Sequence, residues 1–236
     1  MPPNHFFHFK QFSIYQQNCA MKVSTDACLF GAVIPLEESG SILDIGAGTG
    51  LLSLMAAQRS HAQITAVELD SETAGQAQTN FAKSPWQHRI KLHQQSIQDF
   101  AKSTQEKFDT IICNPPFFTN HSPSEDPRRH QARHNDTLSF EDLGKAVSKL
   151  LTSDGQFQVL IPSSEHCRLI EAMKKEGLAL ARQVSVKPTT KKPVSREILS
   201  FSKQAESFSE REICIHTKDG YSAEFVKLLQ PFYLKL

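Results

Sequence analysis

The chain has 236 residues, of which 39% are hydrophobic, and its 26 Lys and Arg against 25 Asp and Glu give a formal net charge of +1. That length predicts one large α/β unit with an appendage, or at most two small domains, and a chain of this size buries a core without disulfide or metal cross-links. No apolar run approaches the roughly 18 residues of a membrane span, and no secretory signal opens the chain, so we expect a cytoplasmic protein with no membrane contact. The five cysteines are scattered without a C-x-x-C pair, which argues against a disulfide framework or a thiolate zinc site.

The first part of the chain predicts an aromatic segment followed by a short helix. Four phenylalanines lie within the first 12 residues. They precede Ser24-Thr25-Asp26, whose hydroxyl and carboxylate groups are typical caps for a helix over 27–33. We therefore expect residues 1–36 to form an amino-terminal flap packed on a main domain that spans 37–236.

The main domain alternates short apolar runs with longer segments of helical period. The predicted strands are 42–45, 64–69, 90–93, 108–113 and 157–161, and the predicted helices are 51–59, 71–83, 140–151 and 164–176. Strands separated by helices predict parallel crossovers and a sheet covered on both faces. Three later strands, 180–187, 196–202 and 212–217, have no long helix between the first two, which predicts an antiparallel edge. The fold class is therefore α/β, a mostly parallel sheet with an antiparallel edge and helices on both faces.

A glycine-rich turn follows the first strand of this domain. Gly46, Gly48 and Gly50 stand between the strand and an apolar helix, where the backbone must turn sharply and leave room for a ligand. Glu68 ends the second strand 22 residues after Gly46, where a carboxylate reaches a ribose diol. Together these residues predict a nucleoside-binding site.

The charge beside the turn selects among nucleoside ligands. Asp44 directly precedes the turn, where its carboxylate would repel a pyrophosphate but attract an ammonium or sulfonium group. Leu51 occupies the position at which the dinucleotide motif needs a third glycine. The predicted cofactor is therefore S-adenosylmethionine. Ser96 and Asp99 follow the third strand and are the two candidates for a contact to the cofactor adenine.

The fourth strand runs straight into Asn114-Pro115-Pro116-Phe117, and two prolines cannot continue a central strand. The chain must leave the sheet at its carboxyl edge, where open α/β sheets bind ligands. Two acceptors, the Asn114 amide oxygen and the Pro115 carbonyl, can each take one N–H of a planar amine and redirect its lone pair toward a methyl donor. Phe117 supplies a stacking face for the base, a contact worth about 1–3 kcal/mol in nucleic-acid complexes.

These motifs resemble the class I S-adenosylmethionine-dependent methyltransferases with an N-P-P-[YF] motif, which implies a Rossmann-like fold with a seven-stranded sheet. Within that group the chain is similar to the tRNA1(Val) N6-adenine methyltransferases, which modify the adenine immediately 3′ of the anticodon. The resemblance covers nearly the whole chain, through residues 9–12, 19–26, 43–52, 66–69, 84–86, 114–118, 131–133 and 232–234.

The resemblance implies a role for each matching residue. The cofactor would be bound by Asp44, Gly46, Gly48, Gly50, Glu68 and Ser96, and the target amine would be held by Asn114, Pro115 and Phe117. Beyond the resemblance, we expect the tRNA to be contacted by Lys22, Thr25, Asp26, Phe118, Arg133 and, in the basic run 182–203, by Lys191, Lys192 and Arg196. Three positions depart from the family pattern: Ser96 replaces an acid, Phe117 replaces the commoner tyrosine, and Ser24 stands where glycine is usual.

The distribution of charge bears on the substrate. Residues 1–25 contain two lysines and no acid, and 182–203 contain six basic residues against Glu197 alone. Such runs are typical of solvated surfaces when isolated, and of nucleic-acid contacts when they rim a cleft. The polar stretch 119–137 is long enough to be a functional lid or a disordered loop.

Other functions remain open at this level. The same motif serves enzymes that methylate the glutamine amide of release factors, DNA adenine or ribosomal guanine, and a degenerate member would bind RNA without catalysis. His121, His130 and His134 share one loop, but without a strand or helix to fix them we expect no metal site. We expect a monomer or a weak homodimer.

Overall fold

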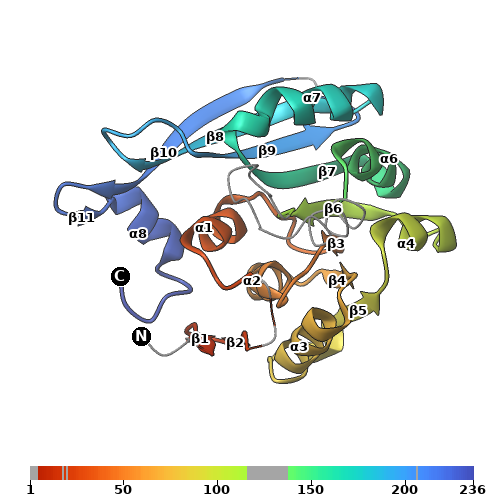
Figure 1. The fold of residues 1–236 in the computed structure, drawn as a ribbon, viewed down its shortest axis with the longest axis horizontal. Coiled ribbons are helices and arrows are strands. Elements are labelled where there is room, and N and C mark those ends of the chain that lie inside the picture. The colour runs from red at the N-terminus through yellow and green to blue at the C-terminus, as the bar shows by residue number, and fades with distance from the viewer. Residues whose placement is uncertain (1–4, 18, 20, 116–137, 206) are drawn as a thin grey trace, which may run out of the picture.

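The computed structural model describes residues 5–17, 19, 21–115, 138–205 and 207–236. Its main feature is a nine-stranded sheet with helices on both faces (Figure 1). The strands of this sheet are β3 (Ser41–Ile45), β4 (Gln63–Glu68), β5 (Ile90–Gln94), β6 (Phe108–Cys113), β7 (Leu151–Pro162), β8 (Ala179–Thr189), β9 (Arg196–Ser202), β10 (Ser209–Thr217) and β11 (Gly220–Tyr221). A separate hairpin is formed by β1 (Phe6–His8) and β2 (Ser13–Tyr15).

The sheet order is β11-β10-β8-β9-β7-β6-β3-β4-β5. Strands β3 to β7 are mutually parallel, and β9 is antiparallel to both of its neighbours, β7 and β8. The predicted class is confirmed, but the predicted count of seven strands is too low. Strand β10 pairs in parallel with the outer side of β8, and β11 folds back on β10. They satisfy backbone groups that β8 would otherwise expose as an edge.

One antiparallel strand, β9, lies inside the sheet, whereas a second, β11, is antiparallel to β10 at its edge. The β8–β9 hairpin places β9 next to β7, where Pro162 of β7 is paired with Arg196 of β9. The start of β9 therefore lies at the same edge of the sheet as the carboxyl end of β7. Residues that precede β9 are thereby brought to the ligand-binding edge.

Alternating side chains of the strands build one apolar core on each face of the sheet. One core is covered by α1 (Thr25–Val33), α2 (Leu51–Arg59), α3 (Ser71–Ala82) and α8 (Ala223–Leu229). The other is covered by α4 (Ile97–Ser103), α6 (Phe140–Leu150) and α7 (His166–Lys175). In Figure 1 the second group lies on the upper right and α1 and α2 on the opposite side of the sheet.

Helix starts follow the predicted capping chemistry. The Ser24 hydroxyl accepts a hydrogen bond from the Ala27 N–H at 3.2 Å, as the sequence predicts, and the helix begins at Thr25. Asp70 caps α3 in the same way through the Thr73 N–H at 3.1 Å. These caps fix where each helix leaves the ligand-binding edge.

The amino-terminal hairpin packs against the far end of the described chain. Phe9 forms a β-bridge with Tyr233, and the Lys10 N–H donates to the Phe232 carbonyl at 2.8 Å. Phe9 and Phe12 are buried in the core that α1 and α2 share. The hairpin thus packs on the body of the molecule, while a domain boundary at residue 36 stays a prediction. Within the described ranges no helix has both the length and the apolar character needed to cross a membrane.

Candidate active site

The glycine turn leaves the carboxyl end of β3 and leads into α2. Gly46, Gly48 and Gly50 have φ values of +67°, +57° and +84°, which only glycine adopts without strain. A Cβ added at Gly46 or Gly48 meets nothing within 4 Å, so the backbone there faces open space. A Cβ at Gly50 would overlap the Phe81 ring of α3. The first two glycines therefore leave room for a ligand, whereas Gly50 is required by packing.

Asp44 lies beneath the turn and is fully buried. Its Oδ2 atom accepts a hydrogen bond from the Ser53 hydroxyl of α2 at 2.6 Å, whereas Oδ1 has no hydrogen-bond partner among the described residues. Burial raises the pKa of Asp44 to about 7, an effect that Ser53 opposes and the neighbouring Glu68 charge reinforces. A cationic group beside the unpaired oxygen would supply the missing partner and stabilise the buried carboxylate.

Glu68, at the end of β4, holds the turn in place. Its Oε2 atom accepts the Gly48 N–H at 2.8 Å, and its Oε1 atom accepts the Asp70 N–H at 3.0 Å. Each carboxylate oxygen can accept more than one hydrogen bond. The residue predicted to reach a ribose diol therefore also fixes the backbone beside which that diol would lie.

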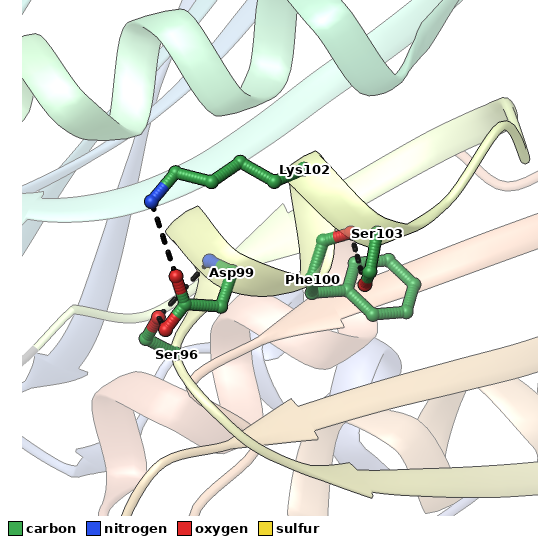
Figure 2. Close-up of polar contacts among 5 residues, drawn as sticks. All are labelled: Ser96, Asp99, Phe100, Lys102 and Ser103. Atoms are coloured by element: carbon green, nitrogen blue, oxygen red, sulfur yellow. Dashed lines mark hydrogen bonds and ion pairs between the residues drawn. The ribbon is translucent and has the colours of Figure 1, made fainter.

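The two residues considered for the adenine contact are bound to each other (Figure 2). The Ser96 hydroxyl accepts the Asp99 N–H at 3.0 Å and donates to Asp99 Oδ2 at 2.8 Å, and Lys102 Nζ lies 3.1 Å from Asp99 Oδ1. The hydrogen bond from Ser96, followed by the interactions with Lys102, lowers the pKa of Asp99. Since the Ser96 hydroxyl has a single proton, its donor is used by this pair, and the cofactor contact of Ser96 stays a prediction.

The outlet of β6 lies directly beside the turn. Ile45 of β3 is paired in parallel with Cys113 of β6, so the residues that follow each strand, Gly46 and Asn114, leave the sheet as neighbours. Asn114 is half-buried and Pro115 is buried. Phe117, Phe118 and Arg133 lie outside the described residues, as does the whole of 119–137 with its three histidines. Among the described residues no group of acids, histidines and cysteines is arranged to hold a metal.

The residues predicted to contact RNA are only partly free to do so. Arg196 Nε lies 3.2 Å from Asp26 Oδ2, so two of the predicted contacts form an ion pair between β9 and α1. Lys191 and Lys192 are exposed in the β8–β9 connection, and Lys22 is exposed before α1. Thr25 is the first residue of α1. The structure thus brings Asp26 and Arg196 together, near the end of β7, and leaves the lysines facing solvent.

Comparison with known proteins identifies the family. A model described as the methyltransferase small domain matches residues 19–177. The chain is 42% identical over 233 residues to the tRNA1(Val) (adenine(37)-N6)-methyltransferase of Bacteroides fragilis (strain YCH46), with 98% of each chain covered. It is 43% identical over 232 residues to the enzyme of the same name from Pseudoalteromonas translucida (strain TAC 125), covering 98% of this chain and 99% of that one. The chain belongs to the tRNA1(Val) (adenine(37)-N6)-methyltransferase family.

Solved structures agree on the fold of this family member. A predicted O-methyltransferase from Agrobacterium tumefaciens superposes with a TM-score of 0.67 at 20% identity, covering 87% of this chain and 96% of that one. A methyltransferase from Pyrococcus furiosus superposes with a TM-score of 0.59 at 19% identity, covering 81% and 89%. At these identities the likeness concerns the Rossmann-like methyltransferase fold alone.

As a member of this family the chain is an S-adenosylmethionine-dependent methyltransferase. The site fits that cofactor on two observations. Asp44 presents an unpaired, buried carboxylate oxygen to a cofactor that carries an ammonium and a sulfonium group. Gly46 and Gly48 leave open space where a nucleoside would pass the backbone.

Two residues that shape the site were not predicted from the sequence. Ser53 is a lone hydroxyl within the apolar helix α2, and Asn80 is a buried amide on the face of α3 that also carries Ala77 and Phe81. A polar residue on an otherwise apolar helix face is the signal that both share. Because such a residue must find a hydrogen-bond partner inside the protein, it points to a specific contact.

Proposed function

We propose that the chain transfers a methyl group from S-adenosylmethionine to the exocyclic N6 of an adenine in tRNA, at position 37 of tRNA1(Val). The observation that carries the proposal is the placement of Asn114 and Pro115 beside the turn above the unpaired oxygen of Asp44. The names of relatives that match 98% of the chain at 42–43% identity support the substrate.

In this proposal the cofactor is held by residues of three strands. Asp44 takes its ammonium group, Glu68 takes the ribose diol, and Gly46, Gly48 and Gly50 form the turn along which the nucleoside lies. Ser96 lies beyond β5, where it contacts the adenine. The donor supplies an electrophilic methyl group on a sulfonium, which becomes neutral after transfer.

The target amine is held by the outlet of β6. Asn114 Oδ1 and the Pro115 carbonyl each accept one N–H, which turns the amine toward a tetrahedral shape with its lone pair aimed at the donor. Because positive charge then develops on nitrogen, its N–H groups become more acidic and their hydrogen bonds to these acceptors strengthen. The methylated nitrogen then loses one proton. Positioning and electrostatic stabilisation supply the catalysis, and no strong general base is needed. Phe117 stacks on the base.

The tRNA approaches over the carboxyl edge of the sheet. Lys22, Lys191 and Lys192 contact backbone phosphates, and Arg196 is held toward that edge by Asp26. Thr25, Phe118 and Arg133 complete the predicted contacts. A base of the anticodon loop is not paired in a duplex, so moving it into the pocket costs little. We place this enzyme in the cytoplasm as a monomer or weak homodimer, with tRNA as its macromolecular partner.

One experiment tests the proposal. The protein is incubated with labelled S-adenosylmethionine and total tRNA from a strain that lacks the enzyme, and the modified nucleoside and its position are identified by mass spectrometry. We expect N6-methyladenosine at position 37 of tRNA1(Val), and far less of it in the same time with Asn114→Ala. Label in release factor, DNA or ribosomal RNA, but not in tRNA, would contradict the substrate. Binding of tRNA without any heat of S-adenosylmethionine binding would favour a non-catalytic RNA-binding protein.

A further inference from the structure

Asn80 of α3 joins two parts of the chain that are far apart in sequence. Its side chain is 1% exposed. Its Oδ1 atom accepts the Tyr15 N–H at 2.9 Å, and its Nδ2 atom donates to the Tyr15 carbonyl and to the Thr49 carbonyl, each at 2.9 Å. Both amide hydrogens and the amide oxygen are therefore used, on the last residue of β2 and on the glycine turn.

The turn is held by the β4–α3 unit at three successive residues. Glu68 accepts the Gly48 N–H, Asn80 binds the Thr49 carbonyl, and the Phe81 ring fills the space against Gly50. Asn80 is the member of this set that also reaches the amino-terminal hairpin. Figure 1 shows β2 lying beside α3, in agreement with the contacts between these two elements.

The contact continues from the hairpin toward α1. Lys83, the residue that caps the carboxyl end of α3, places its Nζ atom over the Tyr15 ring, 4.0 Å from the ring centroid. The next residue, Gln16, is 3% exposed, and its side-chain oxygen accepts the Val23 N–H at 2.9 Å, directly before the Ser24 cap of α1. Hydrogen bonds thus run from the glycine turn through Asn80 and the hairpin to the start of α1.

We propose that Asn80 is a positioning residue that couples the cofactor turn to the amino-terminal hairpin, so that S-adenosylmethionine binding at the turn orders residues 5–17. The coupling follows from a single planar amide whose donors and acceptor cannot be satisfied on both sides unless turn and hairpin keep their relative places. Because α1 carries Asp26, which pairs with Arg196, the ordered hairpin also fixes the edge over which RNA approaches. The place of the cofactor at the turn and this last consequence rest on the proposed function.

Two substitutions separate the contacts of Asn80. Asn80→Asp keeps the acceptor for the Tyr15 N–H but cannot donate to either carbonyl, and Asn80→Ala removes all three hydrogen bonds. Gln158→Ala is the matched control, because Gln158 is an equally buried amide in β7, bound to Ser200 and Gln156 and distant in the fold from the hairpin. This control measures how much cofactor affinity and exchange protection change when a buried amide is removed away from the turn and the hairpin.

The readouts are the Kd for S-adenosylmethionine by calorimetry and amide hydrogen exchange of residues 5–17 and 46–50, with and without cofactor. We expect cofactor to slow exchange of the Tyr15 amide in the unaltered protein. Both Asn80 variants should bind cofactor about tenfold more weakly, and the protection of residues 5–17 by cofactor should be lost. Gln158→Ala should keep that protection and a Kd within about twofold of the unaltered protein.

Unchanged exchange of Tyr15 on cofactor binding in the unaltered protein would overturn the proposal, and this measurement does not depend on any variant folding. Asn80 variants that bind cofactor as Gln158→Ala does would also overturn it. Neither measurement uses RNA. A failed methylation of tRNA therefore does not contradict this inference. Unchanged exchange of Tyr15 does not contradict the methylation of tRNA.

Discussion

Asn114 contributes an uncharged acceptor at the position where the methyl-accepting amine is proposed to lie. Replacing it by alanine removes one of two acceptors that strengthen as charge develops on nitrogen. We expect Asn114→Ala to lower the single-turnover rate of methyl transfer by about 100-fold or more, by analogy with the loss of one group that stabilises transition-state charge. The Kd for S-adenosylmethionine should change less than about twofold, because Asn114 belongs to the outlet of β6 and not to the turn. A parallel loss of cofactor affinity would show that Asn114 acts on the cofactor instead.

Asp44 makes the unliganded protein sensitive to pH. Its pKa is raised from 3.8 to about 7, so between these values the folded state holds a proton that the unfolded chain releases. The contribution of Asp44 to the free energy of unfolding therefore falls as pH rises through that window. We expect Asp44→Asn to make the cofactor-free protein more stable at pH 8, by on the order of 2 kcal/mol, with a smaller gain at pH 5.

The same substitution should abolish binding of S-adenosylmethionine, since the neutral amide has no charge to offer its ammonium group. Denaturant unfolding at the two pH values and calorimetry with the cofactor measure both effects. Ser53→Ala serves as the control that leaves the carboxylate in place but removes its hydrogen bond. If Asp44→Asn changed the free energy of unfolding by the same amount at both pH values, the result would be inconsistent with a buried, partly protonated Asp44.

At the scale of elements, the glycine turn and α3 form one unit. Gly50→Ala would force a methyl group into the Phe81 ring and strain a φ of +84°, so we expect it to destabilise the fold by about 2 kcal/mol or more. Gly48→Ala meets open space and carries only the strain of its positive φ. It should therefore retain more stability than Gly50→Ala. Thermal unfolding compares the two.

A second substitution identifies the cause of the Gly50 effect. Phe81→Leu should restore part of the stability lost in Gly50→Ala, because it withdraws the ring atoms that the added methyl group meets. The same change should not help Gly48→Ala. Independent, additive effects of Gly50→Ala and Phe81→Leu would argue that backbone strain alone is responsible.

The β8–β9 connection is the element proposed to meet phosphates through Lys191 and Lys192. We expect Lys191→Glu combined with Lys192→Glu to weaken tRNA binding. The slope of log K against log salt should become less steep by about 1.4–1.8, which corresponds to the loss of two phosphate contacts. Filter binding across a salt series measures this slope. The control is Lys174→Glu combined with Lys227→Glu, which changes the charge equally on α7 and α8. If both pairs lower the slope alike, the effect is one of overall charge.

Local chemistry explains why some elements could be predicted and others could not. Helix α2 has the bounds that its apolar period and preceding glycine predict, and β6 and β9 also match their predicted ranges. The β1–β2 hairpin was missed because two three-residue strands leave almost no periodic signal. The parallel pairing of β10 with β8 was missed because strand pairing depends on tertiary contacts that a linear pattern does not contain.

The same division holds in the site. Asp44 and Glu68 lie at the carboxyl ends of their strands and Asn114 directly follows one, so their common edge is predictable from the alternation of elements. The pairing of Asp26 with Arg196 depends on where the β8–β9 hairpin inserts β9 into the sheet, and the sequence carries no local mark of that insertion.

At the scale of the whole molecule, the amino-terminal hairpin and the segment after α8 stabilise each other. Phe232 is 2% exposed, and its carbonyl accepts the Lys10 N–H. We expect Phe232→Ala to lower the free energy of unfolding by about 3–5 kcal/mol and to speed amide exchange at Lys10. Phe208→Ala is the control, because that ring is 52% exposed. Normal exchange at Lys10 in a destabilised Phe232→Ala protein would show that the two segments are stabilised separately.

The hydrogen bonds between these two segments have a consequence for folding during synthesis. Lys10 Nζ donates to the Gln230 carbonyl at 2.6 Å across 220 residues of sequence. At about 5–20 residues per second, a ribosome needs roughly 10–45 s between making the first of these partners and the second. Until residues 230–233 are made, the hairpin lacks its β-bridge partner Tyr233 and the two carbonyls to which Lys10 donates. The nascent enzyme can therefore assemble its sheet before residues 230–233 are made, and its amino-terminal hairpin can pack against them only afterwards.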